Sequence, residues 1–162
     1  MKKIIYLFLL VISFFSCKTE TPKVFSEEAL DDTFITLNGD SIPFKEILEA
    51  HKGKTIVIDV WASWCSDCIK GMPKVKALQD NFKDAAYIFL SLDKSQDSWK
   101  KGIVKYDVQG AHYFMQSGWK GPFGTFVELD WIPRYMIVNP DGTIKVFKAI
   151  EADDNKLIEA LK

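Results

Sequence analysis

A run of hydrophobic residues, Thr-Ile-Val-Ile-Asp-Val-Trp, occupies residues 55–61. The run is short and rich in β-branched residues, which is typical of a buried strand. The apolar positions that follow lie three or four residues apart, at Ile69, Met72, Val75, Leu78 and Phe82. This spacing predicts a helix over residues 65–82. A strand, a tight turn and a helix are therefore expected in succession, with Cys65 at the start of the helix.

The residues before this unit predict one further strand and one further helix. Residues 33–37 alternate between polar and apolar positions and end in Asn-Gly-Asp, which favours a strand followed by a turn. Ser41 is placed to cap a short helix that has Pro43 in its first turn and ends before Gly53.

The residues after this unit continue the alternation of strands and helices. Residues 85–92 are nearly all apolar, as in a parallel strand that is covered on both faces. Strand, helix and strand together predict a right-handed crossover. Ser95 is a candidate N-cap for a helix that reaches Tyr106. Residues 107–130, rich in glycine and aromatic residues, predict only a short helix near 123–127.

A hairpin and a closing helix complete the pattern. Residues 134–138 and 143–147 flank the tetrapeptide Asn-Pro-Asp-Gly, which favours a hairpin turn. Residues 153–161 have the amphipathic pattern of a helix. The alternation predicts the α/β class, and a length of 162 residues suits one domain with a sizeable core.

Composition and charge exclude two classes of protein. Hydrophobic residues make up 48% of the chain and charged residues 27%, which excludes intrinsic disorder apart from a short linker. The net charge is −1, and without Lys2 and Lys3 there remain 19 basic and 22 acidic residues, a net charge of −3. Such a balance argues against a phosphate-binding surface, so no nucleic-acid partner is expected.

The first residues have the pattern of an export signal. Lys2 and Lys3 precede an apolar run at residues 4–15. A run of twelve residues is too short to cross a bilayer comfortably, because a spanning helix needs about 20. A cleaved secretory signal is one interpretation of this run.

The end of the apolar run supports a second interpretation. The run ends at Ser16-Cys17 without a small-x-small cleavage site, and it resembles a bacterial lipoprotein signal in which Cys17 is acylated. Phe14 departs from that pattern, which usually has Leu three residues before the cysteine. We favour the lipoprotein signal over plain secretion. The predicted organisation is a signal peptide at 1–16, a tether at 17–28 and a folded domain at 29–162.

The two remaining cysteines, Cys65 and Cys68, predict redox chemistry. Unpaired N–H groups and the helix dipole stabilise an anion at a helix N-terminus, which lowers the pKa of a thiol there, so Cys65 is the predicted nucleophile. Cys68 lies three residues on, on the same helix face, within reach of a disulfide, and is the predicted resolving thiol. A mixed disulfide through Cys65 that Cys68 then displaces needs no cofactor.

Two other interpretations exist for this cysteine pair. A structural zinc site needs four ligands, and only Cys17, His51 and His112 are left to complete one, so no metal is predicted. Inert buried thiols are the other alternative. Both histidines are expected to be surface or packing residues.

The motif also resembles a known family. Residues 59–68, Asp-Val-Trp-Ala-Ser-Trp-Cys-Ser-Asp-Cys, are followed by Pro73 and, far downstream, by Ile132-Pro133. This combination resembles the thioredoxin superfamily, and within it the membrane-anchored TlpA/ResA-type thiol-disulfide oxidoreductases. The likeness covers residues 32–162. It implies a thioredoxin-like fold, a central mixed sheet flanked by helices, with an N-terminal strand and helix added.

The resemblance assigns a proton-transfer role to Asp59. Thioredoxins carry an Asp at the matching position, implicated in deprotonating the resolving cysteine, and burial in an apolar strand should raise its pKa toward neutrality. The alternative is a carboxylate paired with a Lys or a backbone donor. Many TlpA-like proteins carry an acid after the next strand instead, which makes Asp93 a second candidate.

The resemblance also predicts the substrate-binding residues. Thioredoxins hold the proline that matches Pro133 in cis, facing the dithiol, which would free the backbone of Ile132 to pair with an extended substrate segment. An ordinary trans proline at the start of an edge strand is the alternative. Trp64 is expected to form part of an apolar docking surface, whereas Trp61 and Trp131 are equally compatible with the core.

These features together predict a lipid-anchored thiol-disulfide oxidoreductase of the bacterial cell envelope, facing the periplasm. We expect a monomer that reduces disulfides of envelope proteins, apocytochromes among them, and that receives electrons from a membrane thiol-disulfide donor. Ser66-Asp67 departs from the Gly-Pro of thioredoxins, so the preference for reduction is weak.

Two further functions compete with this prediction. A copper-handling chaperone with the same fold would use Cys65, Cys68 and a histidine, although the histidine-containing loop of such proteins is not identifiable. A peroxiredoxin would need the Pro-x-x-x-Thr-x-x-Cys pattern, which the sequence lacks.

Overall fold

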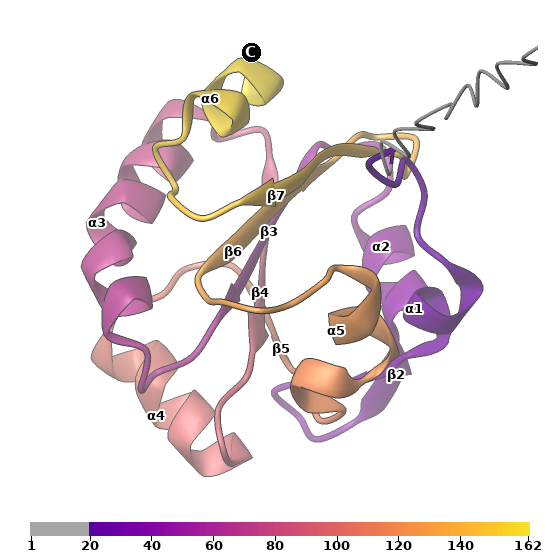
Figure 1. The fold of residues 1–162 in the computed structure, drawn as a ribbon. Helices are drawn as coiled ribbons and strands as arrows, with labels where there is room; N and C mark the ends of the chain where they lie inside the picture. The colour runs from indigo at the N-terminus through magenta and orange to yellow at the C-terminus, as the bar shows by residue number, and fades with distance from the viewer. Residues whose placement is uncertain (1–19) are drawn as a thin grey trace, which may run out of the picture.

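The computed structural model describes residues 20–162, and Cys17 and the predicted signal peptide lie outside these residues. The described chain forms a seven-stranded mixed sheet flanked by helices, as predicted (Figure 1). The strands are β1 (Thr33–Ile35), β2 (Ser41–Pro43), β3 (Ile56–Trp61), β4 (Ala86–Ser91), β5 (Ala111–Phe114), β6 (Arg134–Val138) and β7 (Ile144–Ala149). The helices are α1 (Glu27–Asp31), α2 (Phe44–Ala50), α3 (Ser66–Asn81), α4 (Gln96–Lys105), α5 (Pro122–Phe126) and α6 (Asn155–Leu161), with a 3-10 turn, η1 (Gly118–Lys120).

The sheet has the order β2-β1-β5-β4-β3-β6-β7. The central strand β3 is parallel to β4 and antiparallel to β6. All six residues of β3 are buried, which explains its continuous apolar sequence. Figure 1 shows α3, α4 and α6 on one side of the sheet and α1, α2 and α5 on the other. The carboxyl end of β3 therefore leads directly into the turn before α3.

An aromatic cluster joins the N-terminal elements to α5. The ring centroids of Phe44 and Phe123 lie 4.7 Å apart, those of Phe25 and Phe44 5.0 Å, and those of Phe34 and Phe123 5.6 Å. Asp32 adds a polar contact, because its carboxylate accepts hydrogen bonds from the N–H of Phe123 and from a serine hydroxyl of the preceding turn. The N-terminal addition therefore holds α5, and with it the start of the loop that leads to β6.

The structure corrects the helix that was predicted to begin at Ser41. Ser41 instead opens β2, and α2 begins at Phe44 with Pro43 as its N-cap. Pro43 lies on the edge strand of the sheet, opposite Thr33, where a missing N–H group is tolerated. Pairing with β1 therefore prevails over the local capping signal.

The structure also refines the predicted tether. Phe25 belongs to the core, and α1 begins at Glu27 with Ser26 as its N-cap, so the last residues of the 17–28 segment pack on the domain. The N–H of Ile144 donates a hydrogen bond to the carbonyl of Lys23 (2.7 Å), which joins this segment to the start of β7. Among the helices of residues 20–162, none has the length and apolar character needed to cross a bilayer.

Candidate active site

The dithiol lies at the junction of β3 and α3, as predicted. Cys65 is the N-cap of α3, and Cys65 and Cys68 form a disulfide with 5.3 Å between their Cα atoms. The N–H of Cys68 donates a hydrogen bond to Sγ of Cys65 (3.1 Å). A donor aimed at this sulfur stabilises its anion when the disulfide is reduced. Both side chains are buried, but Cys65 is slightly more exposed than Cys68 and is the one that lines a surface pocket.

A buried carboxylate holds the turn that carries the dithiol. Asp93, just after β4, accepts hydrogen bonds from the Ser63 N–H (3.1 Å), from the Ser63 hydroxyl (2.6 Å) and from the Ser91 hydroxyl (2.9 Å). These bonds fix residue 63, two positions before Cys65. The structure therefore engages Asp93, the second candidate for proton transfer, in supporting the turn.

Asp59 occupies a different environment in the middle of β3. Its side chain is 3% exposed, and neither carboxylate oxygen has a hydrogen-bond partner among residues 20–162. Burial raises the pKa of Asp59 to about 8. The side chain is buried, and among residues 20–162 the structure shows neither the Lys nor the backbone donor of the alternative. An acid with this pKa can accept or donate a proton near neutral pH.

The loop before β6 faces the dithiol from the other side. The Ile132–Pro133 bond is cis, as predicted. The carbonyl oxygen of Ile132 lies 3.6 Å from Sγ of Cys65, although the two residues are 67 positions apart in sequence. The structure thus brings together three of the residues predicted for the site, Cys65, Ile132 and Pro133.

Three tryptophans surround the dithiol at the surface. Trp64 and Trp131 are 52% and 58% exposed, and they share a pocket of about 240 Å³ with Trp119, Cys65 and Ile132. The exposure of Trp64 agrees with its predicted place on a docking surface. Sequence reasoning left Trp131 undecided between core and surface and did not single out Trp119. The position of Trp131 directly before Ile132-Pro133 is the signal that could have identified it.

The hollows around this site differ in character. A second pocket of about 370 Å³, which shares Trp131 with the first, is lined by charged residues that include Lys70, Lys74 and Glu151. Oδ1 of Asp67, in the first turn of α3, lies 3.7 Å from Nζ of Lys70, so the ammonium group partly offsets the negative charge of this carboxylate. A larger open groove of about 1020 Å³ follows β7 and α6, but neither cysteine lines it. The candidate site is therefore the pocket of about 240 Å³ that Cys65 lines.

Neither histidine lines the pocket at Cys65. His112 is buried, stacks on Phe89 with ring centroids 5.3 Å apart, and places Nε2 3.0 Å from the carbonyl of Val108. His51 follows the end of α2. Both agree with the packing and surface roles predicted for them. Over residues 20–162 there is no group of three His, Cys, Asp or Glu side chains that could hold a metal ion.

Comparison with known proteins gives the same picture as the geometry. The chain is 27% identical over 134 residues to the thiol-disulfide oxidoreductase ResA of Bacillus cereus, a match that covers 80% of this chain and 71% of ResA. It is 31% identical over 86 residues to the thioredoxin-like protein YneN of Bacillus subtilis, and this match covers 51% of the chain and about half, 48%, of that relative.

Solved structures and a family comparison extend this result. A thiol:disulfide interchange protein from a Bacteroides species superposes with a TM-score of 0.65 at 25% identity, over 86% of this chain and 88% of that protein. The homologues and structural neighbours thus bear the names of thiol-disulfide oxidoreductases, the class predicted from the sequence. The thioredoxin-like family model matches residues 53–144, the segment that runs from before β3 into the β6–β7 hairpin. The chain belongs to the thioredoxin-like family.

Proposed function

We propose that this protein exchanges electrons with the disulfides of substrate proteins through Cys65 and Cys68. One observation carries the proposal: Sγ of Cys65 accepts the Cys68 N–H at a helix N-terminus and lies beside the Ile132 carbonyl, in a pocket open to the surface. A substrate cysteine that reaches this pocket meets a sulfur whose anion is stabilised by the protein.

The exchange begins with the reduced enzyme. The Cys65 thiolate attacks one sulfur of the substrate disulfide, the substrate S–S bond breaks, and the leaving substrate thiolate takes a proton. Cys65 is then joined to the substrate in a mixed disulfide. The Cys68 thiol gives its proton to the Asp59 carboxylate, and the resulting Cys68 thiolate attacks Sγ of Cys65.

The second attack completes the reaction. The Cys65–Cys68 disulfide forms, and the second substrate sulfur leaves as a thiolate that takes the proton held by Asp59, directly or through water. The substrate has then gained two electrons from the enzyme dithiol and two protons, one from Cys68 and one from water, which replaces the proton that Cys65 released on forming its thiolate. A thiol-disulfide donor must restore the dithiol, since oxidised enzyme cannot reduce a second substrate.

The site and the sequence support a cellular context for this chemistry. The lipoprotein-like signal that ends at Cys17 supports a lipid-anchored monomer in the bacterial cell envelope, where protein disulfides form and persist. Reduction is the favoured direction, with a membrane dithiol as donor and envelope proteins, including apocytochromes, as substrates. The asymmetric burial of the two sulfurs supports Cys65 as the attacking thiol.

Insulin reduction tests the proposal. The wild-type protein should accelerate the reduction of insulin by dithiothreitol, and Cys65→Ser should abolish the acceleration because no attacking thiolate remains. Cys68→Ser should instead accumulate a mixed disulfide, visible as a band that reductant removes. A folded wild-type protein without activity would contradict the proposal.

A further inference from the structure

Arg134 is a charged residue whose side chain is fully buried. It is the first residue of β6, directly after Pro133, and its exposure is 0%. An ionised side chain is rarely buried to this extent unless it is paired and hydrogen-bonded. Burial lowers the pKa of Arg134, and the nearby carboxylate of Asp130 opposes the shift. A cation in such a place needs a structural or functional reason.

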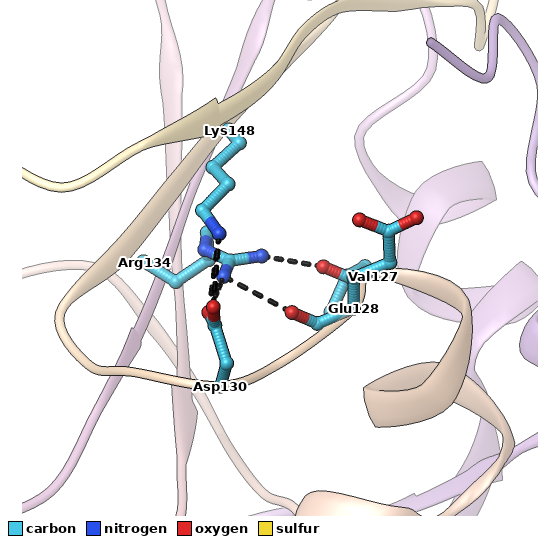
Figure 2. Close-up of polar contacts among 5 residues, drawn as sticks. All are labelled: Val127, Glu128, Asp130, Arg134 and Lys148. Carbon is cyan, nitrogen blue, oxygen red and sulfur yellow. Dashed lines mark hydrogen bonds and ion pairs between the residues drawn. The ribbon is translucent and has the colours of Figure 1, made fainter. Parts of the chain in front are cut away.

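Within the described chain, all hydrogen bonds of the guanidinium are made to its own loop (Figure 2). One Nη donates to the carbonyl of Val127, and the other donates to the carbonyl of Glu128 (3.2 Å) and to Oδ1 of Asp130 (2.6 Å). These partners lie four to seven residues before Arg134. The loop at 127–133 therefore folds back around the side chain of the residue that ends it.

The first residues of this loop need a hydrogen-bond donor for their carbonyl groups. Val127 closes α5 through an N–H bond to Phe123, so its carbonyl is one of those that a helix end leaves unsatisfied. Glu128 has a φ of +50°, a left-handed conformation that is unfavourable for a residue with a side chain. The guanidinium satisfies both carbonyls and so stabilises this turn.

The outer face of the same loop faces the dithiol. Trp131, which is exposed, and Ile132, whose carbonyl lies 3.6 Å from Sγ of Cys65, both lie between Asp130 and Arg134. The guanidinium holds both ends of this short segment. Asp130, at one end, accepts its hydrogen bond, and Arg134, at the other end, is the residue to which the guanidinium belongs. A movement of the guanidinium would therefore move both groups relative to Cys65.

We propose that Arg134 is a positioning residue for protein substrates, one that fixes Trp131 and the Ile132 carbonyl beside Cys65 without touching the reacting sulfurs. The inference rests on the proposed disulfide exchange. An extended polypeptide must lie along this segment while its cysteine bonds to Cys65, whereas a small disulfide needs only the sulfur itself. Arg134 therefore acts on the selection of polypeptide substrates.

The experiment compares a protein substrate with a small one. Reduced enzyme is mixed with an excess of insulin or of 5,5′-dithiobis(2-nitrobenzoate), the rate constant of its single oxidation is measured for each disulfide, and the ratio of insulin to the small disulfide is taken. Arg134→Met should lower this ratio about tenfold, mainly through a higher half-saturation concentration of insulin, since a charged hydrogen-bond network is lost. Arg134→Lys should recover part of the ratio, because lysine keeps the charge but lacks the planar fork.

Two further variants guard the result against a folding defect. Asp130→Asn changes an exposed partner of the guanidinium without emptying the core, and it should lower the ratio about threefold. Lys145→Met, on the exposed side of β7, is the matched control and should keep the wild-type ratio. If Arg134→Met does not fold, the ratio measured for Asp130→Asn tests the positioning role of Arg134.

The outcomes separate the inference from the proposed function. Equal losses with both substrates, or an unchanged ratio in Arg134→Met and Asp130→Asn, would overturn the positioning role while leaving the exchange reaction in place. A wild-type protein that reduces the small disulfide but not insulin would overturn the proposed function itself, and the inference with it.

Discussion

Asp59 has a carboxyl group that is removed from water and, within the described chain, from any hydrogen-bond donor. A buried acid of this kind favours its neutral form, which agrees with a pKa of about 8. The ionised form is costly to hold, so such a group is seldom kept for stability alone. Its place in the strand that leads to the dithiol supports a role in moving the proton of Cys68.

Asp59→Asn should therefore stabilise the protein at alkaline pH. The folded-state pKa lies above the unfolded value near 3.8, so the wild type loses stability as the pH rises from about 4 to about 8, and the loss is complete above that range. The advantage of the variant should grow over this window to a few kcal/mol, with an upper bound on the order of 5 kcal/mol. Chemical denaturation of the oxidised protein at pH 5, 7 and 9 measures it.

The same variant should slow the second exchange step. Without a carboxylate to take the Cys68 proton, release of the mixed disulfide should fall about 10²-fold at pH 7, whereas formation of the mixed disulfide should change little. Quenched-flow trapping of the intermediate separates the two steps. Equal rates of release in both proteins would show that another group accepts the proton.

Trp131 allows a second test at the level of single residues. Trp131→Ala should raise the KM for insulin about tenfold, because an exposed aromatic wall next to Cys65 is lost. Val24→Ala, which also truncates an exposed apolar residue but lies on the N-terminal segment, is the control and should leave KM unchanged. Similar KM values for both variants would remove Trp131 from the substrate surface.

At the level of single residues, the sequence singled out the proposed reacting groups more readily than the residues that support them. Cys65, Cys68, Asp59 and Pro133 were identified because a motif or a resemblance marks them. Arg134 was not identified, since its partners are backbone carbonyls and no sequence pattern indicates which carbonyls a loop leaves unpaired. Asp93 was noticed as an acid, but its hydrogen bonds to Ser63 become visible only in three dimensions.

Among the elements, α4 lies close enough to the active-site turn to restrict its own sequence. Gly102 faces Ser63, and a Cβ atom at residue 102 would collide with the Cβ of that serine. A glycine in the middle of a helix is unfavourable, because glycine is a poor helix former. Packing explains its presence: α4 approaches the turn before Cys65 at a position that admits no side chain.

Gly102→Ala tests which of the two effects prevails. Helix propensity alone would stabilise the protein by about 1 kcal/mol, whereas overpacking against Ser63 should cost about 1–3 kcal/mol. We expect a net destabilisation and a lower rate of insulin reduction, measured by urea unfolding and by the insulin assay. Val104→Ala, at a position that is 82% exposed on the same helix, should change stability by less than about 0.5 kcal/mol.

The strands that sequence reasoning missed share a physical cause. β2 and β5 are short strands of three and four residues. Their assignment depends on pairing with partner strands, β1 for β2 and both β4 and β1 for β5, rather than on their own periodicity. The longer elements β3, α3 and α4 were predicted to within about two residues, because their hydrophobic patterns are long enough to indicate which face is buried.

For the whole molecule, the proposed lipid anchor leads to a cellular prediction. In growing bacteria, the wild-type protein should incorporate radiolabelled palmitate and sediment with membranes, whereas Cys17→Ser should lose the label, because the acylated thiol is absent. Label in Cys17→Ser would contradict acylation at Cys17.

The insulin activity of a protein that begins at residue 20 should equal that of the full chain, since no residue before position 20 is assigned to the site.

The hydrogen bond between Ile144 and Lys23 determines how far the dithiol lies from the point where the N-terminal segment joins the domain. Ile144 pairs with Val138, and Val138 with Ile56, so Lys23 is attached at the amino end of β3. Cys65 follows the carboxyl end of that strand, about 20 Å away along the sheet. If the protein is anchored through the segment before Lys23, its dithiol lies at the opposite end of β3. The cysteines then face substrate proteins in the surrounding medium rather than the membrane that holds the anchor.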